Sequence, residues 1–512
     1  MTDYDIEKQT GVKAGAFSSS TSLEYPPQGS VEDIVQTHPD NLFFRILNNL
    51  KAEIRGIDRV PEEEQTDNSI WNAASMWFSA NFVIASFALG GLGVSVFQLH
   101  FIDSLLTIIF FNILGMAPVA FYSCFGPKFG LRQMVLSRYW FGYQGVRFLA
   151  FFNCIACIGW GTVNTIVSAQ MLHTVNNGGL PVPVAIVIVS ILTFCVSFMG
   201  YHFIHYYEKW AWVPNAVVFL IIAIQMGRSH AFEWGTMDVG TSEAASVLSF
   251  GGAVFGFATG WCPSAADYTV YMPKKTSSVK IFCALMLGLG TPLICVMTLG
   301  AACMTGIRTT PRFAAGYDAN GIGGLVFEIL VTDSLHGFGQ FCVVVLALST
   351  VANNIPNMYS LGLSAQTIWS KFKLVPRAAW AILGNGAVIG ISIAAYYAFE
   401  EFIDNFMNII GYWLAVYTAI NMSAHFFWIG GFKNYNPDIH KDHTKLPVSY
   451  AAMFSFCVGI AGAVLGMDQV WYIGPIAKLI GGGADIGFEI AFGFAFVSFN
   501  FTRWLELRFL GR

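Results

Sequence analysis

The chain has 512 residues, of which 55% are hydrophobic and only 11% are charged, and its net charge is −4. Soluble domains carry roughly 25% charged residues, so this composition excludes an ordinary soluble protein and predicts an all-α integral membrane protein. The small net charge gives no indication of a nucleic-acid partner, and we expect none.

Residues 1–70 are predicted to form a cytoplasmic and largely disordered tail. They are polar and acidic, contain Ser-, Gly- and Pro-rich stretches, and lack the basic-then-apolar layout of a cleavable signal peptide. After them come apolar runs of about 20 residues, each long enough to cross a hydrocarbon core of about 30 Å. We predict twelve transmembrane helices, at 72–97, 101–123, 146–172, 182–199, 208–227, 246–266, 281–304, 337–364, 378–397, 403–424, 449–466 and 484–503.

The basic residues predict the orientation of these spans in the membrane. With both termini cytoplasmic, only four of the 27 Lys and Arg residues fall on the outer side: Arg228, Arg308, Arg312 and Lys478. This asymmetry follows the positive-inside rule, and one missed or extra span would destroy it.

Glycines interrupt spans one and six at comparable positions. Span one contains Gly90 and Gly91, and span six contains Gly251 and Gly252 before Pro263. A broken membrane helix exposes backbone polar groups, which are tolerated only where they line a cavity or a ligand. Paired breaks in two halves of a chain are typical of a transporter's binding site, so we expect a small polar substrate there.

Span three carries an indole and an amide on one face. Trp160 and Asn164 are one helical turn apart near the middle of the span, where a role as an interfacial anchor is less plausible. Span one adds Asn81 and Ser86, and span six adds Trp261. The two tryptophans are suited to enclose a flat heterocycle between aromatic faces.

Span eight carries three carboxamides within five residues, Asn353, Asn354 and Asn357, around Pro356. Amides are costly in hydrocarbon, so they should face protein or water, and each offers a donor and an acceptor side by side. That pattern suits the edge of a planar ligand with adjacent C=O and N–H groups. The alternative is that the amides join helices to one another.

No pattern predicts a metal or a cofactor. Cys154 and Cys157 form a C-x-x-C pair inside an apolar helix, where packing explains them better than redox chemistry. His202 and His205 lie in a short turn without an evident third ligand. No nucleotide-binding loop and no nucleophile–base pair is visible, which argues against a pump or a membrane-embedded enzyme. A channel would need rings of carbonyls or charges around a pore, which this chain does not suggest.

Three stretches of the chain carry a family resemblance: Asn353-Asn-Ile-Pro-Asn-Met-Tyr359, Gly159-Trp-Gly-Thr-Val-Asn164 and the glycine-rich stretch from Gly251 to Pro263. They resemble the fungal purine–cytosine permeases of the nucleobase–cation symporter-1 family. The resemblance runs from about Ile54, with its Ile54-Arg-Gly-Ile-Asp-Arg59 lead-in, through the last span. It implies a 5+5 inverted-repeat (LeuT-like) core at 71–424, two accessory spans at 425–503 and a short cytoplasmic tail at 504–512. It also implies a plasma-membrane symporter that imports cytosine, adenine, hypoxanthine and guanine with protons. Residue by residue, it places six side chains around the base: Ser86, Trp160, Asn164, Trp261, Asn354 and Asn357.

The coupling ion and the substrate branch stay open at this point. In sodium-coupled members the ion lies between span-one carbonyls and span-eight hydroxyls, and Ser349 and Thr350 supply hydroxyls there, although such groups also bond their own helix. Proton coupling needs a titratable group, and the candidates are Glu208 and Asp267; Glu208 also has Lys209 beside it as a simple ion-pair partner. The alternative function is a sodium- or proton-coupled carrier of uracil, allantoin or a hydantoin, which the same family contains.

Overall fold

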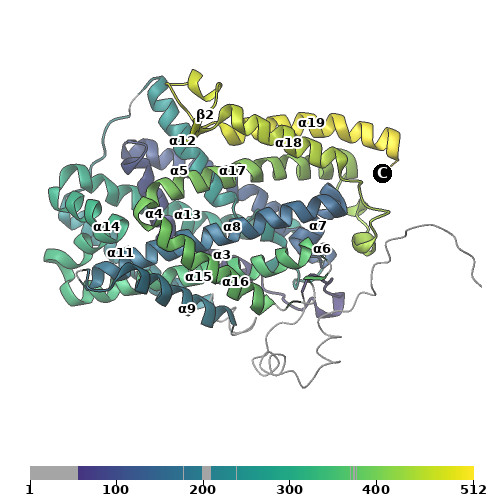
Figure 1. The fold of residues 1–512 in the computed structure, drawn as a ribbon. Helices are drawn as coiled ribbons and strands as arrows, with labels where there is room; N and C mark the ends of the chain where they lie inside the picture. The colour runs from purple at the N-terminus through teal and green to yellow at the C-terminus, as the bar shows by residue number, and fades with distance from the viewer. Residues whose placement is uncertain are drawn as a thin grey trace, which may run out of the picture.

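The structure, a computed structural model, describes residues 56–511 except 177, 199–208, 238, 370, 373–374 and 376. Its long helices lie side by side in one bundle, with the C-terminal pair along one edge (Figure 1). The α-helices are α3 (Ile70–Asn81), α4 (Ile84–Ser95), α5 (Phe101–Ser123), α6 (Phe125–Phe129), α7 (Gln133–Leu136), α8 (Arg138–Val175), α9 (Val182–Phe198), α11 (Trp212–Ser229), α12 (Thr241–Thr259), α13 (Ser278–Thr309), α14 (Pro311–Leu330), α15 (His336–Ile368), α16 (Arg377–Ala395), α17 (Phe399–Ser423), α18 (Tyr450–Gly466) and α19 (Gly487–Leu510).

Shorter elements connect these helices. The 3₁₀ helices are η1 (Glu62–Glu64), η2 (Cys262–Tyr268), η5 (Tyr396–Ala398), η7 (Phe432–Asn434), η8 (Pro437–Lys441) and η9 (Ala477–Leu479), and the π-helical segments are η3 (Val331–Leu335) and η6 (Ala424–Ile429). Two short strands, β1 (Asp468–Gln469) and β2 (Tyr472–Ile473), pair antiparallel between α18 and α19. The sequence analysis predicted neither this hairpin nor α14.

Every predicted span overlaps a helix of the structure. By length and composition, seven helical segments of the described residues are apolar enough to cross a membrane, or eight if α3 and α4 count as one bent span. The protein is therefore a predominantly helical membrane-type fold with several apolar spans, and the number twelve stays a prediction.

Span one is broken, but not at its glycines. The structure ends α3 at Asn81 and begins α4 at Ile84, and the two helices are bent by 54°. Gly90 and Gly91, which we predicted as the break, lie inside α4. Gly90 instead allows close packing, since a Cβ there would lie 1.9 Å from the carbonyl oxygen of Met297 on α13. The predicted position of this break was wrong.

Span six breaks later than predicted. Helix α12 runs through Gly251 and Gly252 to Thr259, and the chain then passes through Gly260 and Trp261 into η2. Pro263 occupies the first turn of η2, where a missing N–H costs nothing, so this proline does mark the second half of the broken span. The two predicted glycines serve packing, because a Cβ on Gly251 would meet the ring of Phe111 at 2.4 Å and one on Gly252 the amide of Asn408 at 2.8 Å.

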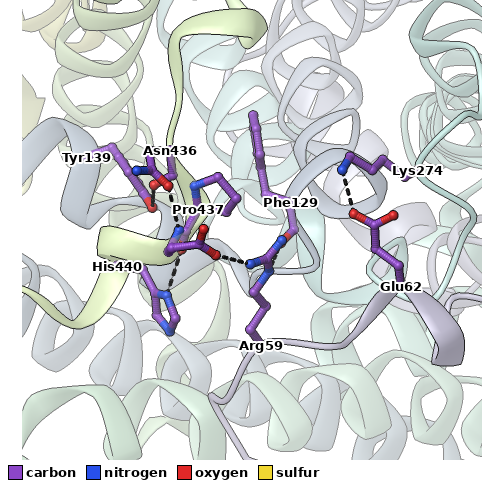
Figure 2. A network of polar contacts seen from close by, with 9 residues as sticks. Arg59, Glu62, Phe129, Tyr139, Lys274, Asn436, Pro437 and His440 are labelled. Atoms are coloured by element: carbon purple, nitrogen blue, oxygen red, sulfur yellow. Dashed lines mark hydrogen bonds and ion pairs between the residues drawn. The ribbon is translucent and has the colours of Figure 1, made fainter.

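The segment before α3 is fastened to the end of the bundle that we predict to be cytoplasmic (Figure 2). Arg59 donates through Nε to the carbonyl of Phe129 at 2.9 Å and pairs through Nη1 with Asp438 at 2.6 Å. Farther along, Glu62 pairs with Lys274 at 2.5 Å. These exposed pairs are individually weak, but together they position the chain as it enters the bundle.

The same end joins α8 to the segment between α17 and α18. Tyr139 donates to the carbonyl of Asn436 at 2.7 Å, and Arg138 donates to the carbonyl of His440 at 2.9 Å (Figure 2 shows the first of these contacts). Burial lowers the pKa of His440 to about 4, so the ring is neutral at pH 7 and does not repel the arginine.

Candidate functional site

The break in span one is held by polar side chains of α15. The amide of Asn353 donates through Nδ2 to the carbonyl of Ala80 at 2.5 Å, and Ser349 Oγ accepts the backbone N–H of Ile84 at 3.1 Å. Both contacts satisfy groups that an unbroken helix would have paired internally. Asn353 and Ser349 of span eight therefore contact the break, and the Ser349 hydroxyl also donates to the carbonyl of Leu346 at 2.6 Å in its own helix, so both roles weighed for it in the sequence analysis stay open.

The two breaks contact each other directly. Trp261, the residue at the span-six break, donates its indole N–H to Oδ1 of Asn81, the last residue of α3, at 3.0 Å. Ser86 donates its hydroxyl across the span-one break to the carbonyl of Asn81 at 2.8 Å. The ring of Trp261 lies edge-on to Trp77, with centroids 5.1 Å apart. Asn81 is thus the junction of the two broken spans.

A cluster of three amides joins α8 to α15. Asn164 donates from Nδ2 to Oδ1 of Asn353 and to Oδ1 of Asn354, both at 2.8 Å, and all three residues are no more than 3% exposed. Because Asn353 also bonds the span-one break, the cluster connects three spans. The predicted base-contacting set omitted Asn353, although its spacing from Asn357 was the signal that would have included it.

Trp160 lies beside the span-six break. Its indole is edge-on to Phe257 on α12 and to Phe406 on α17, with centroids 5.1 and 5.5 Å apart. A Cβ on Gly260 would lie 2.5 Å from this indole, so the glycine leaves the ring room to approach the backbone. Both predicted tryptophans therefore lie at the same break, Trp160 against Gly260 and Trp261 directly after it in the chain.

Asn357 has a different position from the other predicted amides. Its Nδ2 donates to the carbonyl of Cys157 on α8 at 2.6 Å, one turn beyond the amide cluster. At the residue before Asn357, the hydroxyl of Tyr268 in η2 donates to the carbonyl of Pro356 at 2.9 Å. Tyr268 and Trp77 are residues that the sequence analysis missed, since nothing in their local sequence separates them from packing aromatics.

The coupling candidates that the structure describes make separate contacts. Glu208 lies outside the described residues. Asp267 is buried in η2 and accepts the backbone N–H of Gln133 through Oδ1 at 2.7 Å, so its carboxylate caps the first residue of α7. Thr350 pairs with Ser168 of α8 at 2.5 Å. Of the predicted hydroxyls, Ser349 therefore contacts the span-one break and Thr350 faces another helix.

Comparison with known proteins identifies the family of this chain. Residues 59–489 match the family described as "Permease for cytosine/purines, uracil, thiamine, allantoin". The chain is 48% identical to the purine-cytosine permease FCY2 of Saccharomyces cerevisiae, over 99% of this chain and 98% of that protein. It is 47% identical to the purine-cytosine permease fcyB of Emericella nidulans, over 100% and 99% of the two chains. A more distant relative, at 30% identity over 91% of this chain and 89% of the other, is the vitamin B6 transporter TPN1 of Saccharomyces cerevisiae.

The fold is similar to that of a solved transporter. Mhp1, a nucleobase-cation-symport-1 family transporter in a closed conformation with bromovinylhydantoin bound, superposes with a TM-score of 0.65 over 89% of this chain and 95% of that one, at 16% identity. The relatives named here are permeases and transporters. This chain belongs to the family of permeases for cytosine/purines, uracil, thiamine and allantoin, the nucleobase–cation symporters that the sequence analysis identified.

Proposed function

We propose that this protein is a secondary active symporter that imports cytosine and the purine bases adenine, hypoxanthine and guanine together with protons. The observation that carries the proposal is the convergence of the Asn164–Asn353–Asn354 cluster and the Trp261–Asn81 contact on two helix breaks. Amide edges and aromatic faces at one place are what a planar base with adjacent donors and acceptors requires.

The places of these contacts support a transport cycle by alternating access. Asn353 and Ser349 bond the span-one break from α15, and Asn164 connects α15 to α8. A base that replaces such contacts with its own edge would shift the balance between states only by binding one of them more tightly. The buried amides are therefore the proposed link between binding and the relative movement of the broken spans.

The proposed membrane arrangement has twelve spans, a core at 71–424 with spans 1–5 and 6–10 as inverted repeats, accessory spans at 425–503, and cytoplasmic tails at 1–70 and 504–512. In this arrangement the protein lies in the plasma membrane, with both termini on the cytoplasmic side. The helical packing of α18 on α19, and of α19 on α17, is consistent with an accessory pair beside the core.

For the driving ion we propose protons, with Glu208 or Asp267 as the titrating group. The alternative is sodium, held between the span-one break and Ser349. The contact between Ser349 Oγ and the N–H of Ile84 supports Ser349 as a residue beside the break, but it does not distinguish sodium from a proton. A second candidate substrate set is uracil, allantoin or a hydantoin, because the matching family includes uracil and allantoin in its description.

The deciding experiment is uptake of radiolabelled cytosine, adenine, hypoxanthine, uracil and allantoin by cells that express the full chain, at two external pH values. We expect saturable uptake of the first three, faster at the lower pH. Asp267→Asn should flatten this pH dependence. Uptake that follows external sodium at constant pH and disappears in Ser349→Ala would instead establish the sodium alternative.

The two tryptophans give a test of stacking. We expect Trp160→Phe and Trp261→Phe to retain more cytosine uptake than the Ala variants, because a phenyl ring keeps an aromatic face, and stacking is worth about 1–3 kcal/mol per base. Trp261→Phe should be the weaker of the two Phe variants, since it also loses the indole N–H that donates to Asn81. Kinetics of uptake at equal surface level measure the difference. Equal damage by Phe and Ala at Trp160 would contradict a stacking role.

A further inference from the structure

Two arginines at the start of α8 lie against the same aromatic ring. The guanidinium carbon of Arg138 is 4.7 Å from the centre of the Tyr143 ring, and that of Arg147 is 5.3 Å from it. A guanidinium that stacks on a ring keeps its N–H groups in its own plane, where they can still donate hydrogen bonds. The foot of α8 therefore gathers the donors of two cations at one place.

Neither arginine forms an ion pair in the part of the chain that the structure describes. Arg138 is only 4% exposed, and its one hydrogen bond to a described residue goes from Nη1 to the uncharged carbonyl of His440. The charge of Asp58 acts on Arg138, but the Asp58 carboxylate pairs with Lys441 at 3.0 Å. Buried charges are normally paired, so the guanidinium of Arg138 lacks an anion.

Several other bases at this end of the bundle do have acidic partners. Ion pairs are formed by Arg59, Lys441, Lys445 and Arg503. Two guanidiniums beside one ring repel each other, and the repulsion grows as water is excluded. An anion bound to both would remove this repulsion and supply the partner that Arg138 lacks.

The backbone of α8 adds positive potential at the same place. Gly142 has a left-handed conformation with φ of 70°, so the continuous part of the helix begins at Tyr143 and runs to Val175. Ser449 Oγ accepts one of the first N–H groups, that of Gly145, at 3.3 Å. The start of a long helix carries partial positive charge and is a preferred place for a phosphate group. With the two arginines, it favours an anion over any other ligand.

The face of α8 that continues from Arg147 is apolar and exposed. Tyr143, Arg147, Phe151 and Ile155 follow one another at intervals of four residues, so they share one face of the helix. Phe151 and Ile155 are each 52% exposed, as side chains that contact lipid would be. A ligand held by the arginines therefore has an apolar surface beside it, which suits a phospholipid with its acyl chain better than a soluble anion.

We propose that the foot of α8 binds the phosphate group of an anionic phospholipid through Arg138 and Arg147, with an acyl chain of that lipid along Phe151 and Ile155. Two guanidiniums exceed the charge of one phosphate that already carries its own ammonium group, so an anionic headgroup is preferred. The proposed orientation places this site in the cytoplasmic leaflet, where anionic lipids are concentrated. The site goes beyond the proposed transport function and uses only its orientation.

The test is thermal unfolding of the purified full-length protein in detergent with added phosphatidylserine, phosphatidylcholine or inorganic phosphate. We expect phosphatidylserine to raise the unfolding temperature by about 3 °C, since a ligand that binds the folded state stabilises it. The other two probes should have little effect. Arg147→Gln should raise the phosphatidylserine concentration of half-maximal shift about tenfold, because a hydrogen bond from a charged donor is lost. Native mass spectrometry of the same samples should show one retained phosphatidylserine, which Arg147→Gln loses.

Arg508→Gln is the matched control. Arg508, in the last turn of α19, also lies over an aromatic ring, that of Trp504 at 5.2 Å, but it is exposed. We expect this variant to bind phosphatidylserine as the unsubstituted protein does. Equal weakening by the two substitutions, equal stabilisation by phosphatidylcholine or by inorganic phosphate, or neither a shift nor a retained lipid would overturn the site. None of these measurements involves a base or uptake, so their outcome is separate from that of the proposed function.

Discussion

Cytosine uptake should fall about 10- to 100-fold in Asn354→Ala and in Asn357→Ala at base concentrations below saturation. A lost hydrogen bond that leaves a buried polar partner unpaired costs about 1–3 kcal/mol, and every 1.4 kcal/mol is tenfold. In Asn354→Ala the stranded partners are Asn164, whose Nδ2 loses one of its two acceptors, and the bound base. Initial uptake rates at equal surface level measure the effect.

The two variants should differ in their side effects. Asn357 ties α15 to the carbonyl of Cys157 on α8, so its loss should also lower the thermal stability of the protein. Asn385→Ala is the control, because Asn385 is equally an asparagine of a predicted span, and its one hydrogen bond to a described residue goes to the carbonyl of Ala381 in its own helix. Near-normal uptake kinetics in Asn354→Ala, with normal surface expression, would remove the amide cluster from the substrate site.

Helical spacing predicted that the three asparagines of span eight face inward, but not which amides come together, because Asn357 bonds the carbonyl of Cys157 and lies outside the cluster. Asn353, Asn354 and Asn357 lie on consecutive turns, and the cost of placing amides in hydrocarbon makes their inward orientation predictable. The direct bonds from Asn164 to Asn353 and Asn354 agree with that reading. Which atoms bond to which, and the part that Asn81 plays between the breaks, depend on the packing of spans far apart in the sequence.

The positions of the helix breaks could not be predicted in the same way. Glycine in a membrane helix either permits unwinding or permits another backbone to approach, and the local sequence looks the same in both cases. Gly90 is of the second kind, Gly251 makes room for the ring of Phe111, and the actual break at Phe82 and Val83 contains no glycine. The break is stable there because Asn353 and Ser349, from a helix more than 260 residues later, satisfy its backbone groups.

The last prediction concerns the contact between α4 and α13, where two glycines face backbone. A Cβ on Gly90 would lie 1.9 Å from the carbonyl oxygen of Met297, and a Cβ on Gly300 would lie 2.0 Å from that of Phe87. Neither clash can be relieved by a side-chain rotation, so the helices must separate. We expect Gly90→Ala and Gly300→Ala each to destabilise the protein by about 3 kcal/mol, the upper end of the usual cost of overpacking. Thermal unfolding of the purified variants, together with their surface level in cells, measures this loss.

Gly390→Ala is the matched control, since Gly390 lies within α16 and a Cβ there meets nothing within 4 Å. Because alanine favours a helix over glycine, that variant should be as stable as the unsubstituted protein or slightly more so. If Gly90→Ala unfolds at the same temperature as Gly390→Ala and reaches the surface equally well, α4 and α13 do not pack as closely in the membrane as this structure shows, and the unwinding role first predicted for Gly90 regains its place as the explanation for that glycine.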